Sequence, residues 1–265
     1  MPATTYNLAD LFEAAADEWP DRDYIVDERA RRTFAEMDRR ANQLAHHLQS
    51  QGIKPGDHVG IYALNRVEWV EALWAIFKIR AVWVNINYRY VEDELAYLFD
   101  NADLTYLIVE PEYVDRARSV APQLPMLVIG DEYEKTLASN SDARDFAPRS
   151  DDDIYLLFTG GTTGMPKGVM WRQDALRRAM INPALVERVP QDLADHLEIV
   201  RETGQGAICL PACPLMHGTG LLSGINALVN GGTLVLADGT VDGNESYLMR
   251  KLANLLAEHW FVSKP

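Results

Sequence analysis

The chain has 265 residues, of which 48% are hydrophobic and 24% charged, as in an ordinary soluble protein with one large domain or two small ones. Its formal net charge of −14 argues against nucleic acid or an anionic membrane as a partner, because an acidic surface repels phosphate groups. There is no transmembrane-length apolar run, no signal peptide and no set of cysteines for a disulfide scaffold, so we expect a cytoplasmic protein.

Helix and strand patterns alternate through the first part of the chain. An apolar stripe that ends before Pro20 predicts a first helix, formed by Leu8, Leu11, Phe12, Ala15 and Trp19. Thr33 and Glu36 have the spacing of a capping box, which predicts the start of a second helix. Strands are expected over 23–28, 58–64, 81–86, 104–110 and 126–130, and helices over 67–79 and 91–102. This alternation indicates an α/β fold with mainly parallel sheets flanked by helices.

The sequence after residue 130 is less regular. Residues 131–152 are polar and acidic, and we expect a surface connection there, with the aspartates at 151–153 as the solvated start of a strand. A helix is expected over 171–181, followed by a buried strand within 206–220 that leads into a glycine-bearing turn. Residues 221–237 predict a helix, a Gly-Gly stop and another strand.

A glycine-rich loop, "TGGTTGMPKG", lies between two strand-like pieces at residues 159–168. Glycines let the backbone approach a ligand closely, and successive peptide N–H groups can surround an anion. Thr159, Thr162 and Thr163 add hydroxyl donors, and Lys167 adds a mobile positive charge. Together these features suit a polyphosphate ligand.

Other interpretations of the loop fit less well. A Walker A loop, as in P-loop kinases and ATPases, needs Gly-Lys followed by Ser or Thr, whereas Lys167 follows a proline and precedes a glycine. The dinucleotide fingerprint G-x-G-x-x-G is absent from the chain. A glycine-rich hairpin without any ligand remains as the plain alternative.

The loop carries a family resemblance. Every position from Thr159 to Gly168 matches the phosphate-binding signature of the adenylate-forming (AMP-binding) superfamily, which includes acyl-CoA synthetases, luciferases and the adenylation domains of peptide synthetases. "PLMHGTG" at 214–220 resembles the second core motif of these enzymes, and "NGGTLVLA" resembles the strand that follows it. The residues of these motifs are most similar to those of bacterial fatty-acyl or sterol-side-chain acyl-CoA synthetases. Arg80 is a departure, because relatives usually have a glycine there.

The resemblance implies an incomplete large N-terminal domain of an adenylate-forming enzyme. Residues 1–150 would be its first α/β subdomain, and residues 151–238 would hold the phosphate loop and part of the acyl pocket. Residues 239–265 would be a divergent tail, and the C-terminal lid domain of the family would be absent.

The family reaction is adenylation of a carboxylic acid by ATP, followed by thioester formation with coenzyme A. The resemblance implies ATP, Mg²⁺ and coenzyme A as cofactors or co-substrates, with Lys167 and His217 in catalytic roles. His217 and Gly218 would contact the acid, although a histidine satisfied within a buried turn is the alternative. The nucleotide phosphates would be held by Thr159, Gly160, Gly161, Thr162, Thr163, Gly164 and Lys167.

Several family motifs are missing. The chain lacks the aromatic-Gly-x-Thr-Glu motif, the ribose-binding aspartate, the hinge and the late catalytic lysine. It is therefore interpreted as a truncated acyl-CoA ligase or, alternatively, as an inactive fragment that binds only nucleotide or a partner chain supplying the missing motifs. An open half-domain would also expose sheet edges and apolar faces, which predicts self-association.

Cys209, Cys213 and His217 are spaced by four residues, which raises the question of a metal site. Three ligands in a proline-containing strand and turn are a poor match to a zinc site. We therefore expect structural cysteines and no protein-bound metal.

Overall fold

The computed structural model describes residues 7–27, 29–150, 152–161, 164–181, 188–204, 206–211 and 213–236. Thr162, Thr163 and the expected tail at 239–265 lie outside these ranges. The helices are α1 (Leu8–Glu18), α2 (Phe34–Ser50), α3 (Val67–Lys78), α4 (Glu92–Asn101), η1 (Pro111–Tyr113, 3₁₀), α5 (Val114–Val120), α6 (Asp131–Ala138), α7 (Gln173–Met180), α8 (Leu193–Thr203) and α9 (Gly218–Val229). The strands are β1 (Asp23–Val26), β2 (Arg31–Thr33), β3 (His58–Tyr62), β4 (Val82–Asn85), β5 (Leu104–Val109), β6 (Met126–Val128), β7 (Ile154–Gly161), β8 (Gly164–Arg172), β9 (Ile208–Cys209) and β10 (Thr233–Val235).

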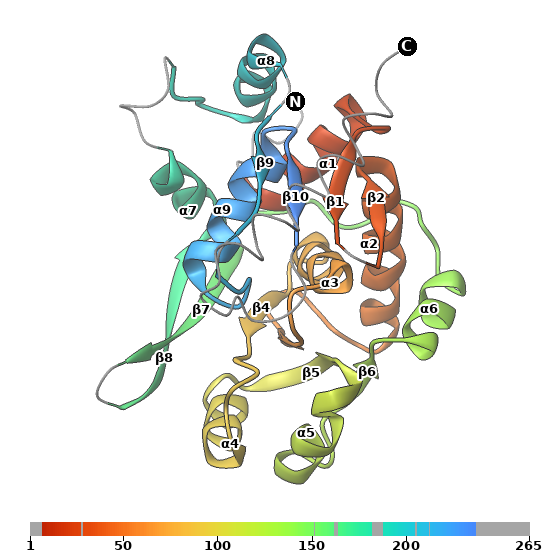
Figure 1. Cartoon of the computed structure of the whole chain (residues 1–265), viewed down its shortest axis with the longest axis vertical. Helices are drawn as coiled ribbons and strands as arrows, with labels where there is room; N and C mark the ends of the chain where they lie inside the picture. Colours follow the sequence, from red (N-terminus) through yellow and green to blue (C-terminus); the bar gives the residue numbers. More distant parts are fainter. Residues whose placement is uncertain are drawn as a thin grey trace, which may run out of the picture.

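The described strands form three sheets (Figure 1). One has the order β2-β1-β10-β9 and is parallel except for the β1–β2 pair. A second, β4-β3-β5-β6, is parallel throughout. The third is the antiparallel β7–β8 hairpin. The expectation of mainly parallel sheets with flanking helices is confirmed.

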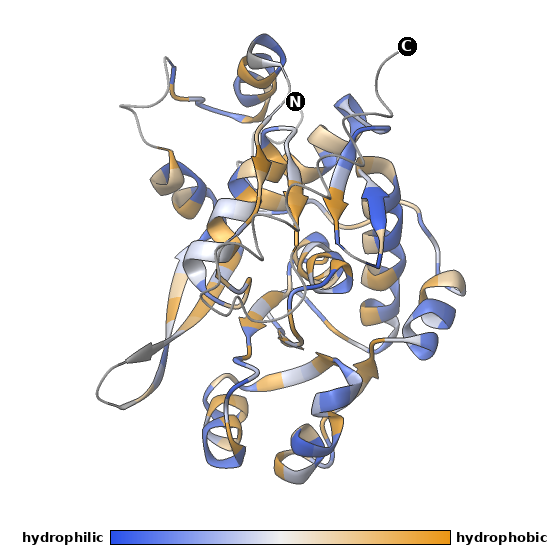
Figure 2. Cartoon of the chain, viewed as in Figure 1, coloured by the Kyte–Doolittle hydropathy of each residue, from blue (hydrophilic) through white to orange (hydrophobic). Residues whose placement is uncertain are grey.

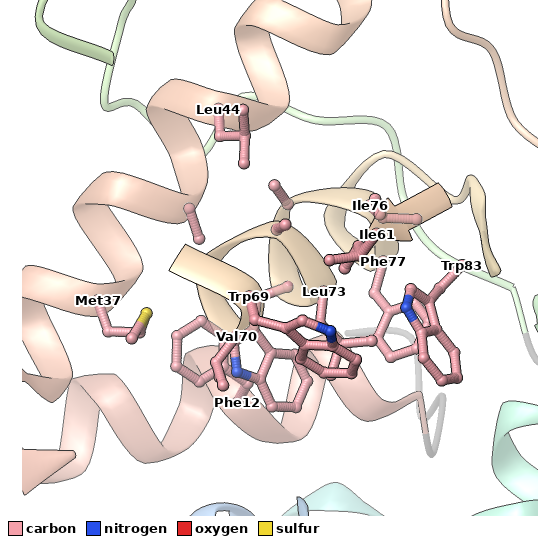
Figure 3. Close-up of a cluster of buried hydrophobic side chains, with 14 of the residues drawn as sticks. Phe12, Met37, Leu44, Ile61, Trp69, Val70, Leu73, Ile76, Phe77 and Trp83 are labelled. Carbon is pink, nitrogen blue, oxygen red and sulfur yellow. The ribbon is translucent and has the colours of Figure 1, made fainter. Parts of the chain in front are cut away.

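The helix α3 lies between the two larger sheets in Figure 1. Every residue of α3 except Glu68 is buried, including the charged Glu71 and Lys78, so the helix is enclosed by protein on all sides. Figure 3 shows side chains of α1, α2, α3 and neighbouring strands packed into one core, and the Phe12 and Trp74 rings stack with centroids 4.6 Å apart. Figure 2 shows hydrophobic residues along β1, β9 and β10, whereas the outer helices mix hydrophobic and hydrophilic residues.

The α2 helix begins as predicted. Thr33 Oγ1 accepts from the Glu36 N–H at 3.2 Å, and the Glu36 carboxylate accepts from the Thr33 N–H at 2.9 Å. This reciprocal capping box satisfies two N–H groups that the helix itself leaves unpaired.

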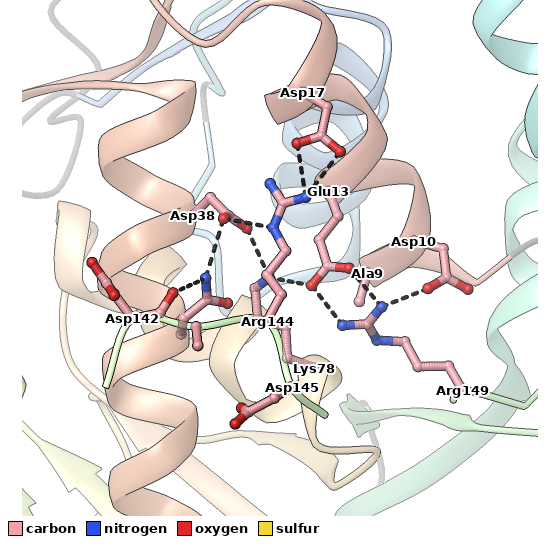
Figure 4. Close-up of polar contacts among 12 residues, drawn as sticks. Ala9, Asp10, Glu13, Asp17, Asp38, Lys78, Asp142, Arg144, Asp145 and Arg149 are labelled. Atoms are coloured by element: carbon pink, nitrogen blue, oxygen red, sulfur yellow. Dashed lines mark hydrogen bonds and ion pairs between the residues drawn. The ribbon is translucent and has the colours of Figure 1, made fainter. Parts of the chain in front are cut away.

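A network of ion pairs ties the segment before β7 to the helical core (Figure 4). The Lys78 ammonium is fully buried and pairs with Glu13 and with Asp38, the latter at 2.8 Å. Arg144 pairs with Asp38 at 2.8 Å, and Arg149 pairs with Glu13 at 2.7 Å. Although burial opposes ionisation, the Arg149 hydrogen bond and the Lys78 charge lower the pKa of Glu13 to about 2. Each buried charge in this network therefore has an opposite partner, as burial of charge requires.

Three expectations from the sequence are wrong in part. The acidic segment after residue 130 contains α6, whose Tyr133 and Leu137 side chains are buried. Asp152 is exposed as expected, but Asp153 is only 8% exposed, and Asn7, Arg80 and the Ser150 N–H all donate to its carboxylate. The expected buried strand within 206–220 is reduced to the two residues of β9, where Ile208 is 48% exposed.

No helix in the described ranges is both long enough and apolar enough to span a membrane.

Candidate functional site

The glycine-rich loop joins the two strands of the β7–β8 hairpin. Thr159 pairs with Lys167 across the hairpin, and Gly161 pairs with Gly164. Both Thr159 and Lys167 are exposed. Residues directly opposite each other in an antiparallel pair point to the same face. The hairpin therefore presents a hydroxyl and an ammonium side by side near its tip.

The strand β7 is held rigidly below this tip. Tyr155, Leu156 and Phe158 are at most 5% exposed, so β7 is anchored in the core. A Cβ atom on Gly168 would lie 3.0 Å from Leu156 Cδ1 and 3.1 Å from Phe158 Cζ, so a larger residue would require these side chains to shift by a few tenths of an ångström. The Lys167 backbone is thereby held close to a buried strand, while its side chain stays in solvent.

The Lys167 ammonium has no acidic partner among the residues that the structure describes. By contrast, Lys78 is buried between two carboxylates. A lysine that is exposed and not neutralised by the protein is available to an anionic ligand. This supports the fit of the hairpin tip to phosphate groups.

His217 is the N-cap of α9, and its side chain is exposed. It is therefore not a histidine whose hydrogen bonds are made inside a buried turn. Although the side chain is exposed, desolvation by the surrounding protein and the positive charge of Arg89 lower the pKa of His217, which favours the neutral imidazole at neutral pH. Arg89 was not identified from the sequence, because it lies far from the motif histidine along the chain. The N-terminal end of α9 carries no acidic residue in its first turn, so its partial positive charge is not offset there.

The start of α9 packs against the phosphate hairpin. A Cβ atom on Gly218 would lie 2.8 Å from Leu157 Cδ2, in the strand that leads to Thr159. His217 therefore lies in the same region of the molecule as the glycine-rich loop. The structure brings together the two motifs that the sequence singled out, although they are about fifty residues apart.

Two asparagines that the sequence analysis did not identify bind the backbone of these motifs. Asn85 contacts the backbone of both Phe158 and Met216, and Asn65 Oδ1 accepts from the Leu215 N–H at 2.8 Å. Asn85 stands at the carboxyl end of a buried parallel strand, and polar residues at that place are a signal for a binding site.

Cys209 and Cys213 are both free and half-buried, and burial raises the pKa of the Cys209 thiol. Within the described ranges, no group of three or more histidine, cysteine, aspartate or glutamate side chains is arranged to hold a metal ion.

Comparison with known proteins decides the family. The AMP-binding enzyme family matches residues 12–263. The chain belongs to the AMP-binding enzymes. The match extends past residue 238 and includes most of the segment expected to be a divergent tail. The division into two subdomains and a tail stays a prediction.

Curated relatives of this AMP-binding chain are named acyl-CoA ligases. It is 41% identical over 248 residues to the 3-oxocholest-4-en-26-oate–CoA ligase of Rhodococcus rhodochrous, covering 87% of this chain and 44% of the relative. It is 40% identical over 253 residues to the medium/long-chain-fatty-acid–CoA/3-oxocholest-4-en-26-oate–CoA ligase of Mycobacterium tuberculosis, covering 89% of this chain and 46% of the relative. The chain thus spans about half the length of these relatives.

Solved structures agree on the fold. The inhibitor-bound N-terminal domain of FACL13 from Mycobacterium tuberculosis superposes with a TM-score of 0.76 at 22% identity, covering 91% of this chain and 59% of that one. The anthranilate CoA ligase AuaEII, in complex with anthranoyl-AMP, gives a TM-score of 0.74 at 23% identity, covering 91% of this chain and 46% of that one. The prediction that the chain has the fold of an N-terminal portion of an adenylate-forming enzyme is confirmed.

Proposed function

We propose that this chain is the nucleotide-binding portion of a cytoplasmic, ATP-dependent acyl-CoA ligase. The proposed substrate is a fatty-acid-like acid or an acid on a sterol side chain, as named for the two relatives above. Membership of the AMP-binding family supports the reaction class.

The observation that carries this proposal is the pairing of Thr159 with Lys167 at an exposed hairpin tip, next to the N-terminal end of α9. In this proposal Lys167 neutralises the β- and γ-phosphates of ATP. The backbone of Gly160, Gly161 and Gly164 and the hydroxyls of Thr159, Thr162 and Thr163 hold the same phosphates. His217 and Gly218 contact the carboxylate of the acid.

The chemistry requires positioning and neutralisation of charge. A carboxylate oxygen bonds to the α-phosphorus of ATP, the bond from that phosphorus to the β-phosphate oxygen breaks, and pyrophosphate leaves. The thiolate of coenzyme A then displaces AMP to give the thioester. Mg²⁺ would neutralise part of the phosphate charge when it is bound with the nucleotide. A neutral His217 can still donate one ring N–H to the carboxylate of the acid.

The test is exchange of labelled pyrophosphate into ATP, measured with a panel of fatty acids and steroid side-chain acids. We expect exchange with at least one acid, and a loss of about 10²-fold or more in Lys167→Ala, because a charge-stabilising group is removed from the phosphates. Lys54→Ala is the matched control, since Lys54 is also exposed but lies outside the site. Equal loss in both variants would contradict the role of Lys167.

A second candidate is supported by the coverage of only 44–46% of the curated relatives. In this alternative the chain binds nucleotide, or a partner chain that supplies the missing motifs, without catalysis of its own. Binding of ATP that depends on Lys167, without exchange for any acid, is the result that distinguishes it.

A further inference from the structure

The side chain of Asn85 is buried in an apolar surrounding at the end of β4. It is 5% exposed, and its neighbours along β4, Val82, Trp83 and Val84, are also buried. A buried carboxamide is retained only when its polar atoms are hydrogen-bonded. The partners of Asn85 therefore indicate what it does.

All three hydrogen-bonding groups of the Asn85 carboxamide bind backbone. Nδ2 donates to the Phe158 carbonyl at 2.8 Å and to the Met216 carbonyl at 2.9 Å. Oδ1 accepts from the Phe158 N–H at 2.6 Å. Toward Phe158 the carboxamide thus forms the same pair of bonds that a residue of a neighbouring strand would form.

Each of the two residues that bind Asn85 comes directly before a predicted site residue. Phe158 directly precedes Thr159, where the phosphate loop begins, and Met216 directly precedes His217. The two segments are 73 and 131 residues from Asn85 along the chain. One buried side chain therefore joins the backbone of both motifs.

We propose that Asn85 is a positioning residue that holds the phosphate hairpin and the His217 turn in a fixed relative arrangement. Its chemical purpose rests on the proposed function: the nucleotide phosphates and the carboxylate must meet at a set distance for adenylation. The hydrogen-bond geometry itself does not depend on that function.

Asn65 provides a comparison, because it binds only one of the two segments. Its Oδ1 accepts from the Leu215 N–H at 2.8 Å, next to Met216. Loss of Asn65 should loosen the His217 turn alone, whereas loss of Asn85 should loosen both segments together. This contrast separates a link between the motifs from simple anchoring of one turn.

The first test is backbone hydrogen exchange of this chain, followed in peptides from β7 and from 213–220. We expect Asn85→Ala to speed exchange about tenfold or more in both peptides. In β7 the Phe158 N–H loses its acceptor, and in 213–220 the loss of the bond to the Met216 carbonyl lets the segment open more often. Asn65→Ala should speed exchange only in 213–220. Peptides of α2, which does not contact Asn85, should be unchanged.

Asn85→Asp distinguishes hydrogen bonding from packing. The aspartate has nearly the same shape, but as a carboxylate it has no N–H and faces the carbonyls of Phe158 and Met216. We expect it to speed exchange in both segments as Asn85→Ala does. The proposal is overturned if Asn85→Asp behaves like the original chain, if only one segment responds to Asn85→Ala, or if α2 exchanges faster to the same extent.

Kinetics provide a second readout that a purely structural role would not produce. In pyrophosphate exchange, Asn85→Ala should raise KM for ATP and KM for the acid together, whereas Asn65→Ala should raise only that for the acid. A change in only one KM for Asn85→Ala would overturn the proposal. If the original chain shows no exchange with any acid, the proposed function fails, while the hydrogen-exchange result still decides the role of Asn85.

Discussion

At the scale of single residues, Arg80 shows how a local conformation and a distant contact oppose each other. Its backbone φ is +63°, a left-handed conformation that costs a residue with a Cβ atom about 1 kcal/mol or more. Arg80 follows the C-cap of α3, the place where glycine commonly ends a helix, which explains the glycine expected from the family resemblance. Arg80 Nε is 2.9 Å from Asp153 Oδ1, so the side chain gains a partner that glycine could not have.

This balance predicts that Arg80→Ala is less stable than Arg80→Gly by about 1 kcal/mol. Both variants lose the ion pair with Asp153, but only alanine retains the left-handed strain. Urea unfolding of the original chain and the two variants would measure the difference. An alanine variant as stable as the glycine variant would show that the backbone at this place relaxes away from its left-handed conformation.

At the scale of elements, α9 depends on two glycines of different character. A Cβ atom on Gly220 would lie 2.6 Å from the carbonyl oxygens of both Cys213 and Pro214. A Cβ atom on Gly224 would meet side-chain atoms of Leu234 and Leu215, the nearest at 3.3 Å. Backbone atoms cannot move aside as a side-chain tip can, so Gly220 is the residue that lets the 213–217 turn close onto α9.

We therefore expect Gly220→Ala to lower the free energy of unfolding by about 1–3 kcal/mol, since the turn that carries His217 must shift. Gly224→Ala is the matched control, because both changes improve helix propensity by the same amount. Gly224→Ala should lower the free energy of unfolding by less than Gly220→Ala does, or not at all. Thermal or urea unfolding of the two variants gives the comparison, and equal stabilities would contradict the close approach of the turn to α9.

At the scale of the whole molecule, buried histidine makes stability depend on pH. His196 in α8 is 1% exposed, and its Nε2 lies 2.8 Å from the Val229 carbonyl at the end of α9. Burial lowers the pKa of His196 from 6.5 to about 4, and the Arg177 guanidinium adds to this effect. Between these two pH values the unfolded chain binds a proton that the folded chain does not. Stability contributed by the neutral imidazole is therefore lost as pH falls from 6.5 to 4.

The expected loss from His196 is at most about 3 kcal/mol over this range. His196→Gln removes the titration, so its free energy of unfolding should fall less steeply between pH 6.5 and 4.5, above the range where Glu13 becomes protonated. His47→Gln is the control, because His47 is only half-buried and its pKa is lowered less markedly. Denaturant unfolding at several pH values measures the slopes, and equal slopes for His196→Gln and the original chain would contradict the prediction.

The outer strand of the hairpin bears on the expected association of the molecule. Val169, Met170 and Trp171 in β8 are 42%, 69% and 43% exposed. Consecutive exposed apolar residues on one strand are unusual for a protein surface. Self-association through this strand stays a prediction.

The amino-acid sequence by itself determined many of the elements and placed the glycine-rich loop between two strands. The capping box, the apolar stripes and the glycine stops are local patterns, and they predicted α2, most strands of the parallel sheets and the two strands that flank the glycine-rich loop. These features depend on residues within a few positions of each other, so their physical causes can be read from the sequence. The sequence missed α6 because its short apolar pattern, Tyr133 and Leu137, lies in an acidic stretch.

Only the tertiary structure decided which residues meet. Asp153 is buried because Asn7 and Arg80 reach it from distant segments, and Arg89 and Asn85 join the site from the β4 region. The hydrogen bonds of the Asn85 side-chain amide join residues that are 73 and 131 positions apart. Local sequence patterns carry no information about contacts over such separations. The physical reason is that these polar groups gain partners only once packing has removed them from water.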